Sequence, residues 1–357
     1  MKKRAKLEDV AREAGVSTAT VSYVINKNPS QTITKETVER VRLAVKKLGY
    51  IPNMAAKSLV TNQSKLIGVV IPQTEPDKEF MFSNPFYGEF LSSVEYVARK
   101  NGYHIIISGT NADENYLKIA NTRNLDGIII VGMYLDKYYT ALKKTQIPIV
   151  LVDCYSQDSC FNKIQIDDRQ GGYLAAKYLI EKGHRTVALI TGLIKKTGVI
   201  EQRLAGYRDA ILEAGMDFDT SLVYDGEVSY EYGRIAGGLL AQNPRKPSAV
   251  FVSADILAIG VVKGLRSNGL MIPRDISIIG FDDTWLSTIC DPPLTAVHQD
   301  IALKGKKAVE IILGISSGRI SGKQDIFLPL SITERESVRT VSRSRSVSGR
   351  IRRSSKK

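Results

Sequence analysis

The chain has 357 residues, with 50 Lys and Arg, 37 Asp and Glu and a formal net charge of +13, a length that suggests about two to three domains. Its 43% hydrophobic and 24% charged residues are typical of globular proteins, which excludes a fibrous or fully disordered chain. The apolar runs are strand-sized, and charged residues stand where a signal peptide would have its apolar stretch, so the sequence predicts a cytoplasmic protein without a membrane segment.

The basic charge is concentrated at the two ends of the chain. Residues 1–62 hold 12 basic and 5 acidic residues, and residues 342–357 hold 7 basic and no acidic ones, so each end carries +7 and the middle carries −1. Clustered Lys and Arg displace counterions from phosphates, and a basic end therefore favours nucleic acid or another anionic surface as a partner. For the C-terminal end, a disordered tail that only keeps the protein soluble is an equally good interpretation.

Three short helices are expected at the N-terminus. Apolar residues recur at helical spacing over Leu7–Ala14, and Gly15 ends this segment. Ser17 is a good N-cap for a second helix, and Thr34 caps a third over residues 35–48. Two helices joined by a turn that contains glycine predict a helix-turn-helix, whose second helix can lie in the major groove of DNA.

The same residues resemble a known family. Residues 7–26, LEDVAREAGVSTATVSYVIN, are similar to the DNA-reading segment of the lactose-repressor (LacI/GalR) family of bacterial transcription regulators. Residues 49–59, GYIPNMAAKSL, are similar to the hinge of that family, a short helix that orders when a dimer sits on its operator. The resemblance implies a homodimeric, sequence-specific repressor whose two recognition helices bind a pseudo-palindromic DNA operator.

The DNA contacts of the family carry over to positions in this chain. The resemblance implies contacts from Ser17, Thr18, Ala19, Thr20, Ser22, Tyr23, Asn26, Tyr50, Asn53, Lys57 and Leu59. Among them Thr18, Ala19 and Tyr23 meet base edges, and Ala19, which has no polar group, can contact only a thymine methyl. Leu59 matches a leucine that is wedged into the minor groove. Lys57 stands where the family often has Arg, so a point charge replaces a planar fork.

From Leu66 onward, short apolar runs alternate with helical patterns. Strands are expected at Ile67–Ile71, His104–Ile107, Gly127–Val131, Ile149–Val152, Val187–Ile190, Ala249–Val252 and Ile276–Gly280. Helices are expected at Phe86–Arg99, Gly171–Lys182, Arg203–Ala214, Tyr232–Ala241, Ile256–Asn268 and Lys304–Leu313. This alternation predicts an α/β fold with parallel sheets covered on both faces and with ligands at the carboxyl ends of the strands.

The resemblance extends over residues 6–338 and implies the two-lobed fold of periplasmic sugar-binding proteins. Its landmarks in this region include Asn84-Pro85-Phe86-Tyr87, Arg203-Leu204-Ala205-Gly206-Tyr207 and Gly280-Phe281-Asp282-Asp283. The expected domains are a helix-turn-helix domain at 6–49, a hinge helix and linker at 50–65, a two-lobed effector-binding and dimerisation domain at 66–338, and a basic disordered tail at 339–357.

A small-molecule effector is expected in the cleft between the lobes. The expected contacts are Phe86, Tyr87, Asp153, Arg203, Asp255, Asp282 and Trp285. Arg203 and Asp282 are the strongest of these, because an arginine fork and a carboxylate suit hydrogen bonds to hydroxyl or carboxylate groups. Asp255 either contacts the ligand or caps the next helix, and Trp285 either floors the cleft or packs beneath it. Val228 stands where the family often has a stacking aromatic, so the effector class (a sugar, a sugar derivative or a purine-like compound) stays open.

No catalytic, metal or cofactor site is expected. Residues 314–318, GISSG, match the nucleophile-elbow pattern, but an expected helix precedes them where the pattern requires a strand. The three histidines are far apart, the three cysteines lack metal-ligand spacing, and neither G-x-G-x-x-G nor a P-loop occurs. Two alternatives remain: a solute-binding receptor of a transport system, which should have a cleavable signal and no helix-turn-helix, and an α/β enzyme with an accessory DNA-binding domain.

Overall fold

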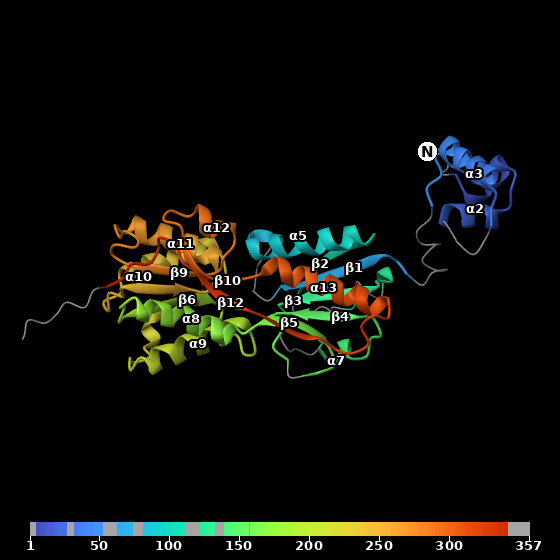
Figure 1. Ribbon diagram of the computed structural model, residues 1–357. Coiled ribbons are helices and arrows are strands. Elements are labelled where there is room, and N and C mark those ends of the chain that lie inside the picture. The colour runs from blue at the N-terminus through green and yellow to red at the C-terminus, as the bar shows by residue number, and fades with distance from the viewer. Residues whose placement is uncertain are drawn as a thin grey trace, which may run out of the picture. The chain divides into compact units, whose positions relative to one another are not determined.

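The computed structural model describes residues 5–26, 32–52, 63–73, 81–111, 117, 122–132, 139–156 and 158–341 (Figure 1). The chain divides between Ser64 and Lys65 into two compact units, here called the N-terminal unit and the body. Most of the expected hinge and all of the tail beyond Val341 lie outside the described residues. Among the helices that the structure describes, none has the length and hydropathy needed to cross a membrane.

In the part of the N-terminal unit that the structure describes, three helices form a bundle, as expected. They are α1 (Leu7–Ala14), α2 (Thr18–Asn26) and α3 (Lys35–Leu48). The Ser17 hydroxyl accepts a hydrogen bond from the Thr20 amide and so caps α2, while Gly15 and Gly49 end α1 and α3 in the left-handed conformation that glycine adopts without strain. Six side chains from the three helices form its core: Val10, Ala11, Ala14, Val21, Val41 and Ala44.

The described residues of the body form two six-stranded sheets. The first has the order β11-β5-β4-β3-β1-β2 and is parallel throughout; the second has the order β12-β10-β9-β8-β6-β7, with only β12 antiparallel. The first sheet consists of β1 (Leu66–Gln73), β2 (His104–Asn111), β3 (Gly127–Val131), β4 (Ile149–Val152), β5 (Asn162–Ile166) and β11 (Asp325–Leu328). The second consists of β6 (Val187–Gly192), β7 (Val223–Gly226), β8 (Ala249–Val252), β9 (Ser277–Asp282), β10 (Thr295–Gln299) and β12 (Leu330–Thr333).

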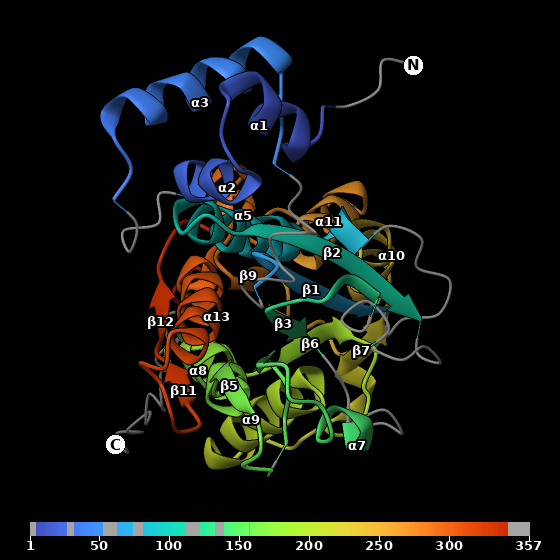
Figure 2. The same ribbon diagram turned by 90° about the vertical axis from the view of Figure 1, so that its right-hand side faces the viewer.

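Helices complete the two lobes, and Figures 1 and 2 show α5 and α13 with the first sheet. The N-terminal lobe has η1 (Met81–Ser83), α5 (Pro85–Lys100), α7 (Tyr139–Leu142) and α13 (Ile301–Ser316). The C-terminal lobe has α8 (Asp168–Glu181), α9 (Val199–Glu213), η2 (Thr220–Leu222), α10 (Tyr230–Ala241), α11 (Asp255–Ser267) and α12 (Trp285–Ile289). The chain passes between the lobes after β5, after β10 and after β11. These three crossings define the lobe junction.

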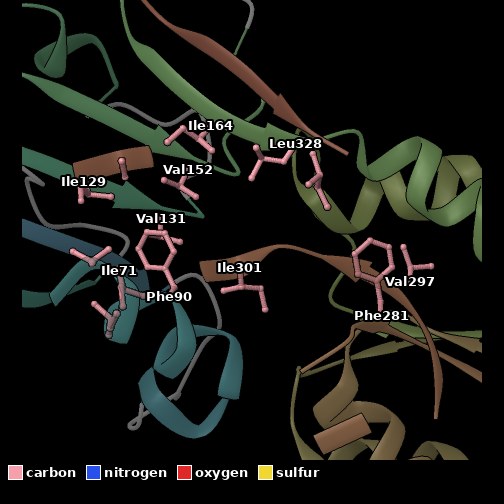
Figure 3. Close-up of a cluster of buried hydrophobic side chains, with 14 of the residues drawn as sticks. Ile71, Phe90, Ile129, Val131, Val152, Ile164, Phe281, Val297, Ile301 and Leu328 are labelled. Atoms are coloured by element: carbon pink, nitrogen blue, oxygen red, sulfur yellow. The ribbon is translucent and has the colours of Figure 1, made fainter. Parts of the chain in front are cut away.

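One buried apolar cluster runs through the lobe junction (Figure 3). It includes Phe90 and Val152 of the N-terminal lobe and Phe281 of the C-terminal lobe, and Ile301 lies between them at the second crossing. Each lobe also has one buried apolar cluster of its own. Buried apolar surface contributes about 25 cal/mol per Å² to the stability of the fold. Since both lobes share this core, it fixes where the polar groups of the junction lie.

Two glycines bring α8 and α9 into backbone contact. A Cβ built on Gly206 of α9 would lie 1.8 Å from the Arg169 carbonyl oxygen, and one on Gly172 of α8 would lie 2.0 Å from the Arg203 carbonyl oxygen. No larger residue fits at either position without moving a helix. This close approach places the side chain of Arg203 beside the start of α8.

The expected two-lobed α/β fold with parallel sheets is confirmed, and its elements differ from expectation mainly at their ends. Strand β9 runs to Asp282, so this aspartate belongs to the strand and does not follow it. Helix α9 begins at Val199, so Arg203 lies one turn inside the helix, not at its start. Five strands were not expected: β5, β7, β10, β11 and β12. Strand β5 is rich in polar residues, β7, β11 and β12 are short edge strands, and β10 lies next to the edge strand β12.

Candidate functional site

The exposed side of α2 carries the residues expected to read DNA. Ser17, Thr18, Ala19 and Asn26 are exposed, and Thr20, Ser22 and Tyr23 are half-buried. Val21 points the other way and is fully buried in the three-helix core. Helix α2 therefore presents one polar edge to its surroundings, with Ser17 and Thr20 joined by a hydrogen bond of 2.9 Å between their hydroxyl oxygens.

The remaining expected DNA contacts fall into two groups. Tyr50 packs against the three-helix core, and its amide donates to the Val45 carbonyl oxygen, so the structure gives it a packing role besides any contact with DNA. Asn53, Lys57 and Leu59 lie outside the described residues. Their roles stay predictions.

A second expected site lies in the body, where Arg203 is buried at the lobe junction. Its Nε donates to Asp168 Oδ1 at 2.7 Å, and its Nη1 donates to the Ser253 carbonyl oxygen at 2.6 Å. Its guanidinium carbon lies 3.6 Å from the centre of the Phe281 ring, a distance at which a cation is attracted to an aromatic face. Only 7% of the surface of Arg203 is exposed, and the Nη1 atom that bonds to Ser253 also lies near Asp282.

Asp282 faces Arg203 without a direct hydrogen bond. The Arg203 Nη1 atom and the Asp282 Oδ1 atom are 3.9 Å apart, which is longer than a hydrogen bond between such groups. Burial raises the pKa of Asp282 to about 6, against the lowering effect of the Arg203 charge. A ligand group that both accepts and donates, such as a hydroxyl, fits the chemistry of this pair.

A chain of charged and amide groups continues from Asp282 into the other lobe. Gln299 Nε2 donates to Asp282 Oδ1 at 2.6 Å, and Gln299 Oε1 accepts from Lys304 Nζ at 2.6 Å. Lys304 Nζ also donates to both oxygens of Asp153, at 2.6 and 2.7 Å. The expected residues Asp153, Arg203 and Asp282 thus belong to one network, and on the other side Tyr155 donates to Asp168 Oδ2 at 2.6 Å.

Asp255 is a buried carboxyl that joins two loops. Its Oδ2 accepts from the amide and the hydroxyl of Thr284, at 2.6 and 2.9 Å. Among the described residues its Oδ1 has no hydrogen-bond partner. Burial, followed by repulsion from Asp282, raises the pKa of Asp255 to about 8. Asp255 is the first residue of α11 and joins it to the β9–α12 loop through Thr284. The N-cap of α11 is Ala254, with no side-chain cap hydrogen bond, so the expectation that Asp255 caps this helix is wrong, and its contact with a ligand stays a prediction.

Three aspartates at the carboxyl ends of strands have strained backbones. Asp282 has φ +101°, and Asp153 and Asp283 have φ +52° and +60°. Such values are uncommon outside glycine and cluster at functional sites, where surrounding contacts hold them. Asp283 is held by Thr333, His298 and Arg335, so its neighbour Asp282 is aimed at Arg203 by a fixed turn.

The expected aromatic contacts occupy different environments. Phe86 is half-buried, stacks on Phe90 and lies 5.7 Å from Lys304 Nζ. A Cβ built on Gly132, the residue after β3, would lie 3.9 Å from the Tyr87 hydroxyl oxygen. Trp285 starts the short helix α12 with 60% of its surface exposed, so the alternative in which it packs beneath the cleft is wrong. The alternative in which Trp285 floors the cleft and contacts a ligand stays a prediction.

Sequence reasoning missed three members of this network: Asp168, Gln299 and Lys304. For Lys304 a signal was present, because it occupies the apolar stripe of α13 together with Ile301, Ala308 and Ile311, at positions where a charge is out of place. For Gln299 and Asp168 no local pattern distinguishes them from ordinary residues at a strand end and a helix start.

Replacing Asp255 by asparagine is expected to stabilise the protein at neutral and alkaline pH. The raised pKa means that the folded state binds a proton which the unfolded state releases above about pH 4. Stability from this group is therefore lost as the pH rises from about 4 through 8. Asp255→Asn keeps the acceptor for Thr284 and removes the charge, so urea unfolding at pH 8 should show a gain of up to several kcal/mol and at pH 4 little change.

The matched control for this prediction is Asp225→Asn, which changes an exposed carboxylate on β7. It should leave the pH profile of unfolding unchanged. Parallel profiles for the wild type and Asp255→Asn between pH 5 and pH 8 would contradict the assignment.

Two sequence families match this chain. The family described as bacterial regulatory proteins, lacI family, matches residues 6–53, and the periplasmic binding protein-like domain matches residues 176–338. The first match covers the three helices and the start of the expected hinge. The second covers most of the C-terminal lobe and the returning segment with α13, β11 and β12.

Individual proteins are similar over almost the whole chain. A protein named HTH-type transcriptional repressor PurR from Vibrio atlanticus is 34% identical over 343 residues, which is 94% of this chain and 99% of that protein. Catabolite control protein A of Priestia megaterium is 33% identical over 338 residues, 93% and 98% of the two chains. The solved Lac repressor dimer, bound to operator and the anti-inducer ONPF, matches with a TM-score of 0.80 at 27% identity, covering 94% and 100%.

Proposed function

This chain belongs to the LacI family of bacterial transcription regulators, and from that premise we propose that it is a repressor that binds a pseudo-palindromic operator as a homodimer. It acts in the cytoplasm, where its DNA is. A small molecule held between the lobes controls it. The solved Lac repressor, a dimer on its operator, supports the dimeric arrangement. Two recognition helices related by a two-fold axis read half-sites about one helical turn apart, or a multiple of it.

The polar edge of α2 supports the DNA-reading half of this proposal. Thr18 and Tyr23 carry the polar groups that can meet base edges, and Ala19 contributes only a methyl group. Exposed Arg40, Arg42 and Lys46 on α3 add positive charge in the same unit, which favours phosphate contacts that position the protein without reading sequence.

The pair of Arg203 and Asp282 supports the second part of the proposal, that a small-molecule effector binds between the lobes. Both groups are buried, belong to one rigid network and stand 3.9 Å apart with no direct hydrogen bond. This geometry favours a hydroxyl-rich ligand, such as a sugar or a sugar derivative, whose neighbouring hydroxyls bond to the guanidinium and the carboxylate together. By linkage the effector and the operator change each other's affinity by the same factor, typically worth about 1–3 kcal/mol.

Two alternatives are less well supported. A solute-binding receptor shares the two-lobed body but has no use for the helix-turn-helix unit that precedes it here. An enzyme with an accessory DNA-binding domain is disfavoured, because the similar proteins that cover the whole chain are transcription regulators.

Footprinting tests the DNA-reading half. The purified protein should protect a pseudo-palindrome upstream of its own gene or a neighbouring one. Tyr23→Ala should lower the affinity for that site about tenfold or more, because a base contact is lost. As a control, Lys46→Ala removes an exposed charge of α3 and should weaken binding to all DNA sequences alike, with a smaller salt slope. Protection of no palindrome, or an unchanged Tyr23→Ala footprint, would refute the proposal.

A thermal-shift panel tests the effector half. Sugars, sugar phosphates, purines and organic acids are compared on the full chain, and a bound ligand raises the melting temperature by mass action. Asp282→Ala should remove any shift seen with the wild type. A shift that persists in this variant places the ligand elsewhere.

A further inference from the structure

Lys304 is a fully buried amine at the lobe junction, with 0% of its surface exposed. It belongs to α13, the helix that packs on α5 in the N-terminal lobe. Its ammonium group donates to both carboxylate oxygens of Asp153 and to the Gln299 side-chain oxygen. A lysine has three N–H donors, so these contacts use all of them and fix the position of the amine.

Gln299 connects this amine to the other lobe. It is the last residue of β10 in the C-terminal lobe, and its Nε2 donates to Asp282 Oδ1. A rotation of the amide by 180° would place its NH₂ group against the Lys304 amine and its oxygen against the Asp282 carboxylate. Both contacts would be repulsive, so the amide has one orientation. We call the pair Gln299 and Lys304 the interlobe bridge.

The interlobe bridge lies at a chain crossing that both lobes share. Gln299 and Lys304 flank the passage from β10 to α13, and Ile301 between them is buried in the cluster that spans the junction. Asp153 is anchored to the first sheet by its own amide, which donates to the Ile164 carbonyl oxygen. Among these contacts, the one between Gln299 Oε1 and Lys304 Nζ joins the two lobes, so a change in the angle between the lobes acts on this contact.

We propose that Gln299 and Lys304 are positioning residues that transmit the state of Asp282 to the angle between the two lobes. A ligand that bonds to Asp282 Oδ1 competes with the Gln299 amide for the same oxygen. Release of that amide frees Gln299 Oε1 from its fixed place and leaves Lys304 held by Asp153 alone. The inference rests on the proposed effector site for its regulatory meaning, while the mechanical role of the bridge can be measured without any ligand or DNA.

The test measures the distance between the lobes. Spin labels are placed by Lys100→Cys on α5 and Lys263→Cys on α11, two exposed positions, in a full-length chain whose native cysteines are replaced by alanine. The bridge is removed by the double substitution Asp153→Asn with Lys304→Met, which leaves no orphan charge. The matched control is Lys163→Met with Asp325→Asn, which removes an ion pair of 2.8 Å between β5 and β11, inside one sheet.

Removal of the bridge should shift and broaden the distance distribution, and the control should match the wild type. Gln299→Met, which keeps the Lys304–Asp153 pair, should produce the same shift and serves if the double variant does not fold. Asp282→Asn should shift the distance in the same direction and add nothing once the bridge is absent.

Wild-type distances in both bridge variants, or a full additional shift from Asp282→Asn, would overturn the inference. Because this readout requires no effector, its failure is distinct from a failure of the thermal-shift panel, which bears only on the ligand site.

Discussion

Replacing Arg203 by alanine should abolish ligand binding and lower the free energy of unfolding by about 3–5 kcal/mol, the usual cost of removing one partner of a buried ion pair. Arg203 is 7% exposed and compensates the charge of Asp168, whose side chain is 0% exposed, with Asp282 nearby. Without the guanidinium, these two buried carboxylates lose its compensating charge. Urea unfolding measures the loss of stability, and the thermal-shift panel measures the loss of ligand binding.

Arg203→Lys separates the two effects if the alanine variant does not fold. A lysine keeps the charge, but it cannot donate to Asp168 and to the Ser253 carbonyl oxygen with one planar group while facing Asp282. We expect a folded protein that no longer responds to the ligand. Arg208→Lys changes an exposed arginine on the same helix and should leave both properties unchanged. Wild-type ligand affinity in Arg203→Lys would contradict the assignment of the site.

Val21→Asp should abolish operator binding while leaving the body intact. Val21 is 0% exposed at the centre of the three-helix core, and a buried unpaired carboxylate costs several kcal/mol. A helical unit of this size has a small core and little stability to lose. We therefore expect the N-terminal unit to unfold and operator affinity to fall to the non-specific level, about a thousandfold or more.

Fluorescence anisotropy on the operator and circular dichroism measure this outcome. The control Leu43→Asp makes the same charge change at a residue of α3 that is 59% exposed, and it should keep the helices folded. The thermal shift with ligand should be the same in Val21→Asp as in the wild type, since the two units are separately compact. Specific operator binding by Val21→Asp would refute the role of this core.

The helices of the N-terminal unit follow from local signals alone. Ser17 and Thr34 cap α2 and α3, and Gly15 and Gly49 end α1 and α3, as their residue types predict. The cap residues and the apolar spacing indicate the same helix ends, so interactions between residues close in the sequence are sufficient to predict these helices.

Strand β5 shows why local signals fail in the body. Its sequence is Asn162-Lys163-Ile164-Gln165-Ile166, and every residue is buried. Asn162 donates to the Ile149 carbonyl oxygen, and both Lys163 and Gln165 contact Asp325. These partners come from β4 and from β11, the latter about 160 residues away in the chain, so nothing within a strand-sized window indicates that the polar residues can be buried.

The residues of the candidate effector site also differ in how well the sequence predicts them. Arg203 and Asp282 were found through a resemblance that extends along the whole body, and the structure brings them within 3.9 Å. Lys304 and Gln299 complete the network through contacts between lobes, which depend on how three chain crossings are arranged. A buried lysine in an apolar stripe is the one local clue to that arrangement.

The three crossings also determine the order in which the body can be completed during synthesis. All but one strand of the C-terminal lobe lie between residues 187 and 299, whereas the N-terminal lobe obtains α13 and β11 only after residue 300. While the ribosome is still making that segment, α5 lacks the helix that packs on it and β5 has an unpaired edge. The N-terminal lobe is synthesised first but is completed only after most of the C-terminal lobe. The shared core at Ile301 therefore closes near the end of translation.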